Sequence, residues 1–359
     1  MGFTNCRNAH LAAGLGTVLR DGLLPAVAMT LLSVIGPPRA SAQVIEGAAA
    51  GNATPAESQE PAPLYAAPTR LDRAGRVLAA VEINGQGPFR FILDTGANRS
   101  AISPQTVEKL GLSAQPQSTV DVQGVTGSAL LPSVDIDSLK AGGILVPRRR
   151  LPVLSSDVFA GADGILGIEG LENARIEVDF VNDRVTIAPS TGKRVPWDAL
   201  IVPVRREHGG LLMADGHMGR MRVQVVVDTG AERTLGNAPL RDALLHRVSA
   251  DRRTPTTVLG ATPDIANGIT FLAPALQFGQ VHLTNLPVTF GDLYVFEVWG
   301  LADEPAVVIG MDLLGTLRGF AVDYRRKELQ LTTFGATAPN LRKCGPYECG
   351  SRVPPPSGN

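Results

Sequence analysis

The chain has few aromatic residues and almost no net charge. Aromatic residues occupy 5% of the 359 positions, whereas the chain contains 39 Gly and 27 Pro. This balance favours many turns and short strands over long helices. The formal net charge of −1 excludes a general electrostatic attraction to nucleic acid or to an anionic membrane surface. We therefore expect a β-rich globular protein that does not bind nucleic acid.

Cysteine and histidine are also scarce, and their spacing does not indicate a metal site. Cys6 lies near the N-terminus, while Cys344 and Cys349 lie in "KCGPYECG" with no histidine close by in sequence. The latter two are candidates for a local disulfide in an oxidising compartment. The five histidines have no metal-ligand spacing, so we expect no metal.

The one markedly apolar run near the N-terminus is short for a membrane span. It reads "GLLPAVAMTLLSVIG" from Gly22 to Gly36, with arginines before it, and "PPRASAQ" after it has the small-x-small form that a signal peptidase accepts. We expect residues 1–42 to be a signal peptide that is cleaved after Ala42, and the protein to be periplasmic or secreted. The alternative is an uncleaved membrane anchor, which would be the protein's only contact with a membrane.

Two segments have the composition of linkers. Residues 43–70 are rich in Ala, Pro, Gly and polar residues without an apolar period, which indicates a disordered linker or a short pro-segment. Residues 335–359, which end in "VPPPSGN", are expected to be a flexible tail. The functional part of the chain should lie between these two segments.

A tetrapeptide, Asp-Thr-Gly-Ala, occurs twice between these segments. "FILDTGANRSAIS" begins at Phe91 and "VVVDTGAERTLGN" begins at Val225, so the two copies lie 134 residues apart. Each copy follows three apolar residues and precedes a polar run. One copy would fit an ordinary turn, but two copies in matching contexts indicate an internal repeat.

The residues beside the two copies match as well. Before each copy we expect a β-hairpin, with turns at Asn84-Gly85 and at Asp215-Gly216. After each copy we expect a short helix, with Ser103 and Asn237 as the N-cap residues. The same order of elements in both halves supports the repeat.

Further landmarks recur later in each half. "GILGIEGL" from Gly164 matches "VVIGMDLL" from Val307, and a pair of strands then closes each half, in "ARIEVDFVNDRVTI" and in "GFAVDYRRKELQL". We expect two homologous β-rich lobes, residues 71–195 and 200–334, packed about a pseudo-twofold axis.

An Asp at the end of each of two strands has a clear chemical use if the lobes bring the two together. Two adjacent carboxyl groups cannot both ionise cheaply, so Asp94 and Asp228 would share one proton, an effect for which aspartic proteases are a known example. The ionised carboxylate would take a proton from water, while the protonated one would polarise a carbonyl group. This chemistry needs no metal and no cofactor.

The residues that follow each Asp suit the support of such a pair. Thr95 and Thr229 would join the two loops through hydroxyl and backbone hydrogen bonds. Gly96 and Gly230 would let the backbone approach the carboxylates closely.

At these residues the chain resembles the aspartic proteases. The two "Φ-Φ-Φ-Asp-Thr-Gly-Ala" motifs, each with a later "Φ-Φ-Gly", are similar to the active-site and supporting motifs of that superfamily, and Ala97 and Ala231 resemble its retropepsin branch, as found in bacterial exported aspartyl proteases. The resemblance implies an all-β fold of two retropepsin-like β-barrel lobes in a pepsin-like arrangement, with Asp94 and Asp228 as the catalytic pair. It also implies that two hydrophobic-Gly segments pack beneath the active-site loops, namely Ile165, Leu166 and Gly167, and Val308, Ile309 and Gly310.

The resemblance further implies a flap, a hairpin that closes over bound peptide. "VDVQGVTGSALLPSV" from Val120 has the right place for one, with a tip formed by Gly124, Val125, Thr126 and Gly127. "TTVLGATPDIANGITFL" from Thr256 is its counterpart in the second lobe. The alternative is that both are ordinary surface hairpins.

Two arginines stand five residues after the aspartates. We expect Arg99 and Arg233 to pair with Asn98, with Glu232 or with the opposite lobe, and substrate contact is the alternative.

The sequence thus predicts an aspartic-type endopeptidase that acts on a peptide or protein as a monomer. One alternative is a catalytically silent module of the same fold that binds a peptide or envelope protein. Another is a protease that is active only when lobes of two chains pair.

Overall fold

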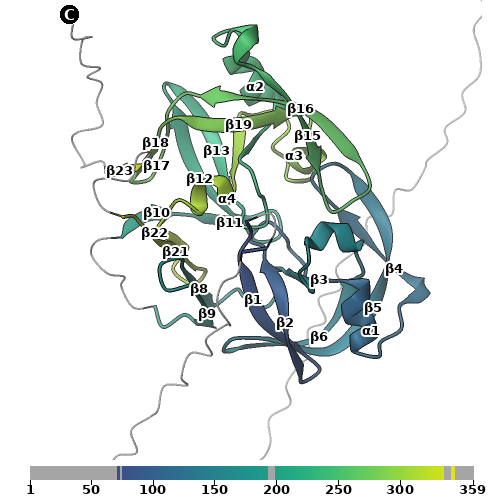
Figure 1. Ribbon diagram of the computed structural model, residues 1–359. Coiled ribbons are helices and arrows are strands. Elements are labelled where there is room, and N and C mark those ends of the chain that lie inside the picture. Colours follow the sequence, from purple (N-terminus) through teal and green to yellow (C-terminus); the bar gives the residue numbers. More distant parts are fainter. Residues whose placement is uncertain (1–70, 73–74, 193–198, 335–340, 344–359) are drawn as a thin grey trace, which may run out of the picture. The chain divides into compact units, whose positions relative to one another are not determined.

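The computed structural model describes residues 71–72, 75–192, 199–334 and 341–343 (Figure 1). The predicted signal peptide, the linker up to residue 70 and all three cysteines lie outside these ranges. Within them, the chain forms twenty-three strands, four short α-helices and two 3-10 turns, which confirms the all-β prediction. No helix in this part of the chain is long and apolar enough to cross a membrane.

The first sheet is built from the first half of the chain. Its strands are β1 (Leu78–Ile83), β2 (Gln86–Leu93), β3 (Ala101–Ile102), β4 (Gln115–Gln123), β5 (Ser128–Ala141), β6 (Ile144–Pro152) and β7 (Gly164–Leu166). Their order is β3-β7-β2-β1-β5-β4, and β6 pairs with β5. Two short elements accompany this sheet, α1 (Pro104–Lys109) and the 3-10 turn η1 (Ser156–Phe159).

A second, larger sheet is built mostly from the second half. Its strands are β11 (Arg205–Glu207), β12 (Leu211–Met218), β13 (Met221–Val227), β14 (Leu235–Gly236), β15 (Thr254–Leu259), β16 (Ile265–Ala273), β17 (Leu276–Phe278), β18 (Val281–Leu283), β19 (Leu286–Gly291), β20 (Ala306–Ile309) and β23 (Leu341–Lys343). They run in the order β15-β16-β19-β14-β20-β13-β12-β17-β18-β23, with β11 beside β12. The accompanying helical elements are α2 (Ala238–Leu245), η2 (Ala250–Arg252), α3 (Tyr294–Val298) and α4 (Met311–Leu314).

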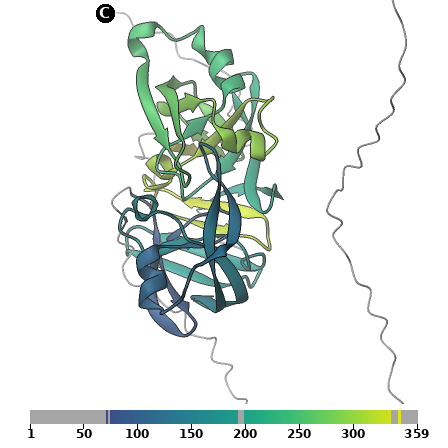
Figure 2. The ribbon, with the colours of Figure 1, turned by 90° about the vertical axis from the view of Figure 1, so that its right-hand side faces the viewer.

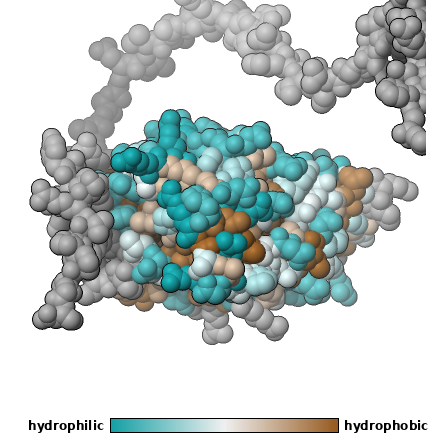
Figure 3. All heavy atoms as spheres, turned by 90° about the horizontal axis from the view of Figure 1, so that it is seen from above, coloured by the Kyte–Doolittle hydropathy of each residue, from teal (hydrophilic) through white to brown (hydrophobic). Residues whose placement is uncertain are grey.

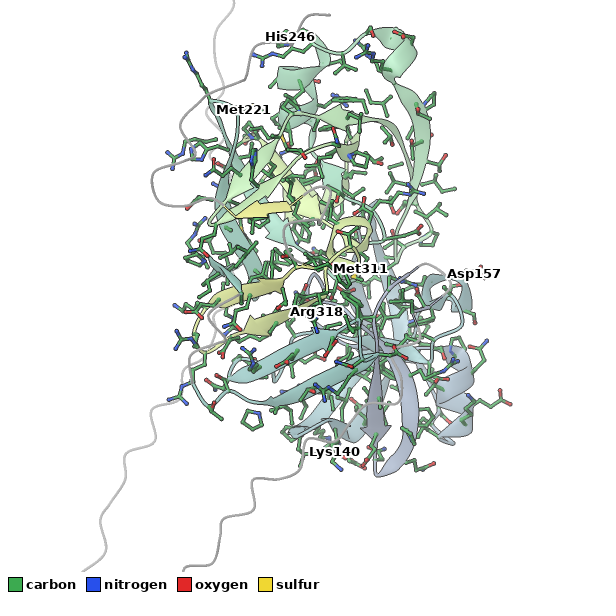
Figure 4. The ribbon with its side chains drawn as sticks, turned by 60° about the vertical axis from the view of Figure 1, so that its left-hand side comes forward. Lys140, Asp157, Met221, His246, Met311 and Arg318 are labelled. Carbon is green, nitrogen blue, oxygen red and sulfur yellow. The ribbon has the colours of Figure 1, made fainter. Side chains whose placement is uncertain are left out.

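A third sheet takes strands from both halves. It has the order β10-β22-β21-β8-β9, and its strands are β8 (Ala174–Asp179), β9 (Arg184–Pro189), β10 (Leu200–Pro203), β21 (Gly319–Asp323) and β22 (Glu328–Thr332). The two halves join where β8 pairs with β21, in an antiparallel register that sets Gly319 opposite Asp179. Arg318, labelled in Figure 4, leads into β21, and its backbone carbonyl accepts a hydrogen bond from Phe180 N–H at 3.1 Å.

The buried residues explain why these segments form strands. In β2 the last three side chains, Phe91 to Leu93, are all buried, and in β13 the same holds for Val225 to Val227. Each of these strands also pairs with a parallel neighbour, β7 or β20, and continuous buried runs of this kind are typical of parallel strands whose two faces are both covered. The face over β16 and α2, seen from above in Figure 3, carries mostly hydrophilic side chains around an apolar area.

Both predicted N-caps are confirmed. The Ser103 hydroxyl accepts a hydrogen bond from Thr106 N–H at the start of α1. The Asn237 side chain accepts one from Leu240 N–H at the start of α2, and a proline stands in the first turn of each helix.

One predicted turn is wrong. β1 and β2 do turn at Asn84-Gly85, but β12 continues through Asp215-Gly216 and turns at Gly219, with Met218 opposite Met221. Gly216 is needed for close packing within the sheet, because a Cβ there would lie 2.8 Å from Val225 Cγ2 and 3.0 Å from a backbone oxygen of β17. Gly219, with φ of 63°, provides the left-handed turn residue instead.

The tail also differs in part from its prediction. Three residues of the segment expected to be flexible, Leu341–Lys343, form β23 and pair with β18 at the edge of the second sheet. Edge strands offer unpaired backbone groups, which explains how a short polar segment can be held there.

Candidate active site

Asp94 and Asp228 each follow directly on the end of a buried strand. Asp94 comes after β2, and its N–H donates to Leu166 O of β7 at 3.0 Å. Asp228 comes after β13, and its N–H donates to Ile309 O of β20, also at 3.0 Å. The hydrophobic-Gly segments therefore fix the backbone from which each carboxyl group projects.

The threonines next to the aspartates join the two loops by a reciprocal set of hydrogen bonds. Thr95 N–H donates to Thr229 Oγ1 and Thr229 N–H donates to Thr95 Oγ1, each at 3.1 Å. The Thr95 hydroxyl donates to Val227 O at 2.8 Å, and the Thr229 hydroxyl donates to Leu93 O at 2.6 Å. Both threonines are fully buried, so these bonds are shielded from water and hold the ends of β2 and β13 together.

Each glycine of the repeated motif lies against the carboxyl group of the other copy. A Cβ placed on Gly96 would lie 2.5 Å from Asp228 Cγ, and a Cβ on Gly230 would collide with the Asp94 carboxyl group. The two carboxyl groups are therefore neighbours at the junction of the loops. Only glycine leaves room for this arrangement.

Backbone amides hold both carboxyl groups in place. Asp94 Oδ1 accepts hydrogen bonds from the N–H groups of Gly96 and Ala97, both at 2.9 Å. Asp228 Oδ1 accepts them from Gly230 at 2.8 Å and from Ala231 at 3.3 Å. The inner oxygens are thus satisfied by the loops, which orients the pair.

The environment of the pair favours the protonated form. Burial raises the pKa of Asp94 well above its ordinary value, and repulsion from the nearby Asp228 carboxylate raises it further. Burial also raises the pKa of Asp228, but the backbone N–H groups and a hydrogen bond from Asp94 lower it in part. Two coupled carboxyl groups of this kind hold one proton between them over an interval of pH.

A second layer of side chains supports each loop from below. In the first half Ser100 N–H donates to Glu169 Oε1 at 2.6 Å, and Gly167 N–H donates to the Ser100 hydroxyl at 3.0 Å. In the second half, Thr234 donates to Asp312 through its N–H at 3.0 Å and its hydroxyl at 2.8 Å, and Gly310 N–H donates to Thr234.

We did not predict these support residues from the sequence. Glu169 and Asp312 each stand two positions after the Gly of a hydrophobic-Gly segment, and this matching offset was the available signal. Burial raises the pKa of both acids. Met311, labelled in Figure 4, adds a further tie between α4 and the active-site loop, because its N–H donates to Ala231 O at 2.8 Å.

The two predicted hairpins exist, and their tips meet. The tip of the β4–β5 hairpin, residues 124–127, is closed by a hydrogen bond from Gly124 N–H to Gly127 O at 2.8 Å. The hydroxyls of Thr126 and Thr262 lie 3.3 Å apart, and Gly127 lies against the Asp264 carboxyl group. Figure 2 shows the dark-blue β4–β5 hairpin reaching the green β15–β16 hairpin.

The first tip makes one more contact with the second half. Val295 N–H of α3 donates to Val125 O at 3.3 Å. The side chain of Val125 also packs against a buried apolar cluster of the second half that contains Val258 and Phe296.

The ion pairs expected for Arg99 and Arg233 are wrong. Neither guanidinium lies within ion-pair distance of a carboxylate in the described part of the chain. Burial raises the pKa of Asp312, and the charge of Arg233 offsets part of this rise. Arg99 is exposed and lines a cavity, described below.

The described residues do not bring three or more His, Cys, Asp or Glu side chains together as a metal site. The expected disulfide between Cys344 and Cys349 lies outside these residues.

Comparison with known families agrees with this geometry in the first half of the chain. A family model described as aspartyl protease matches residues 79–169, which include Asp94, the β4–β5 hairpin and the first hydrophobic-Gly segment. A search of curated proteins found no significant match. The family match supports assignment to the aspartic protease superfamily and an aspartic protease-like, hydrolytic function.

Proposed function

We propose that the protein is an aspartic-type endopeptidase in which one chain supplies both catalytic aspartates, Asp94 and Asp228. One observation carries this proposal: each carboxyl group lies against the glycine of the opposite Asp-Thr-Gly-Ala motif. The reciprocal bonds of Thr95 and Thr229 support it, because they hold the pair together within a single chain.

In the proposed reaction the pair activates water. The ionised carboxylate takes a proton from a water molecule, whose oxygen attacks the scissile carbonyl carbon, while the proton of the other carboxyl group moves to the carbonyl oxygen. Collapse of the resulting intermediate breaks the C–N bond, and the pair returns a proton to the leaving nitrogen. Burial raises the pKa of both carboxyl groups, so the pair keeps one proton between them for this step.

The surrounding elements have roles in the same proposal. The substrate would lie extended between the two lobes, 71–195 and 200–334, and hydrogen-bond like an added strand. The β4–β5 and β15–β16 hairpins would be flaps that open to admit it and close to exclude water. Export to the periplasm or the medium, after cleavage of residues 1–42, is also part of the proposal and is supported by the N-terminal sequence alone.

The test is proteolysis by the pure protein. The mature chain is incubated with a denatured protein mixture at several pH values, with and without pepstatin, beside the Asp94→Asn variant. We expect cleavage that pepstatin inhibits and that the variant lacks. If the wild-type chain binds peptides without cleaving them at any pH, the silent binding module replaces this proposal.

A further inference from the structure

An open cavity rich in arginine is lined in part by the loop that carries Asp94. Its volume is about 540 Å3. The residues that line it, called here the arginine cavity, are Arg99, Thr119, Val120, Asp135, Arg148, Arg149 and Arg150. They come from the first active-site loop and from the neighbouring strands β4, β5 and β6 (Figure 1). The chain as a whole is almost neutral, so this concentration of charge is local.

Three of the four arginines in the cavity form no ion pair with a carboxylate of the described residues. Arg150 forms a two-point ion pair with Asp135, Nε to Oδ1 at 3.0 Å and Nη2 to Oδ2 at 3.1 Å. Arg149 donates to the backbone carbonyls of Pro147 and Arg148, both at 3.0 Å, and its charge also acts on the buried Glu169.

The other two arginines of the cavity have no such partner. Among the described residues, no carboxylate lies within ion-pair distance of Arg99 or Arg148, and both are exposed. Asp135 is the one acid that lines the cavity, and Arg150 already binds both of its oxygens. The cavity can therefore accept a further anion.

The position of the cavity connects it to the path proposed for the substrate. Arg99 belongs to the loop that carries Asp94, and the backbone of this loop is fixed where Ile168 N–H donates to Ala97 O at 3.0 Å. Thr119 and Val120 belong to β4, the first strand of the hairpin whose tip meets the second half. The cavity is therefore lined by both the loop that carries Asp94 and the hairpin proposed as a flap, two elements that a bound peptide would contact.

We propose that the arginine cavity binds an acidic side chain, Asp or Glu, of the peptide substrate, and so sets a preference for acidic sequences beside the scissile bond. This inference rests on the proposed function. A guanidinium group offers paired N–H donors that match a carboxylate, and such charge-assisted bonds are strong. Among the described residues no aromatic side chain lines the cavity, so the aromatic platforms on which single-strand-binding proteins stack successive bases are missing, which favours a peptide over a single-stranded nucleic acid.

The first experiment maps cleavage sites. Fragments from a denatured protein mixture are sequenced by mass spectrometry, and we expect Asp and Glu to be enriched at one position within about four residues of the cut, within the reach of an extended chain. For a matched pair of decapeptides with Glu or Gln at that position, kcat/KM should be about 10-fold higher for Glu. Equal values for the two peptides would overturn the proposal.

Variants of the cavity arginines test whether the preference for acidic residues comes from the cavity. The double variant Arg99→Gln/Arg148→Gln should remove the preference for Glu over Gln, and Arg148→Glu should favour a decapeptide with Lys at the same position. The control is Arg222→Gln, which changes an exposed strand arginine of the second half and should leave the ratio unchanged. A ratio that is unchanged in the double variant as well would also overturn the proposal.

Measurements of peptide binding distinguish a failure of this inference from a failure of the proposed function. Fluorescence anisotropy of the labelled Glu and Gln decapeptides is measured with the Asp94→Asn chain, which should bind without cleaving. If the wild-type chain cleaves nothing but binds the Glu peptide through Arg99 and Arg148, the cavity inference stands and the protease proposal fails. If a single-stranded oligonucleotide or inorganic phosphate binds there and the Glu peptide does not, the inference fails.

Discussion

At the scale of single residues, the proposed reaction makes Asp94 and Asp228 one functional unit. We expect Asp94→Asn and Asp228→Asn each to lower turnover at least about 1,000-fold, and the double variant to lose little more, because residues that act as a unit are strongly non-additive. Initial rates on one peptide substrate measure this. Losses that multiply in the double variant would show that the two carboxyl groups act separately.

The raised pKa of Asp94 also predicts how stability depends on pH. Above the ordinary value of 3.8, the unfolded chain releases this proton while the folded chain keeps it, until the pH passes the raised value. The folded state then binds more protons, so the free energy of unfolding falls as pH rises through that interval.

Asp94→Asn removes the carboxyl group that causes this fall in the free energy of unfolding. The variant should therefore gain stability relative to wild type as pH rises above 3.8. Urea unfolding at a series of pH values measures the difference. The control is Asp135→Asn, for which the sign is opposite because the hydrogen bond from Arg150 lowers the pKa of Asp135. A constant difference between Asp94→Asn and wild type across this range would contradict the assignment.

A substitution at Gly96 tests how closely the two active-site loops must approach each other. A Cβ at this position would lie 2.5 Å from Asp228 Cγ, so Gly96→Ala must push the carboxyl group or the loop away. We expect a loss of about 1–3 kcal/mol in stability from overpacking and of about 100-fold in turnover from misplacement. Gly143→Ala is the matched control, because its Cβ would meet no atom closer than 3.4 Å. Full activity of Gly96→Ala would contradict the close approach.

At the scale of elements, the contact between the two hairpin tips gives a direct test of gating. The hydroxyls of Thr126 and Thr262 lie 3.3 Å apart, so cysteines at both positions need only a small shift to form a disulfide. The oxidised Thr126→Cys/Thr262→Cys chain should lose at least about 90% of its activity on protein substrates, because the flaps cannot open. A reducing agent should restore it. The single variants are the controls, and full activity of the oxidised chain would contradict a gating role.

The elements that the sequence predicted correctly are those determined by residues close together in the chain. Capping by Ser103 and Asn237 and the turn at Asn84-Gly85 depend on neighbouring residues, and all three are confirmed. The turn at Asp215-Gly216 was wrong because Gly216 serves a packing need created by β17, about 60 residues further on. A residue's long-range neighbours are not visible in its own segment.

The sequence likewise predicted some parts of the candidate site and missed others. The paired motifs identified Asp94 and Asp228, and their neighbours fall where the repeat places them. The sequence did not reveal the arginine cavity, because it joins Arg99 to residues of β6 about 50 positions later. Nor did it show that the two hairpin tips touch, which depends on how the sheets are placed.

At the scale of the whole molecule, the described halves are tied together at two levels. The pairing of β8 with β21 makes one sheet from both halves, and the threonine hydrogen bonds join the loops above it. Bonds within a chain form at a high effective concentration, so the second half of the same chain should outcompete that of another chain. This argument favours an active monomer over a protease assembled from two chains.

Mixing two inactive variants tests this choice. If halves from different chains can pair, an equimolar mixture of Asp94→Asn and Asp228→Asn chains would regain activity, because some pairs would combine an intact Asp94 with an intact Asp228. We expect the mixture to remain at least about 100-fold below wild type, since exchange requires breaking both the β8–β21 pairing and the buried threonine bonds. The mixture is assayed after refolding the two variants together from urea, which gives exchange its best chance, and sedimentation velocity on wild type should show a monomer. Recovered activity, together with a dimer in sedimentation, would mean that the active site forms between chains.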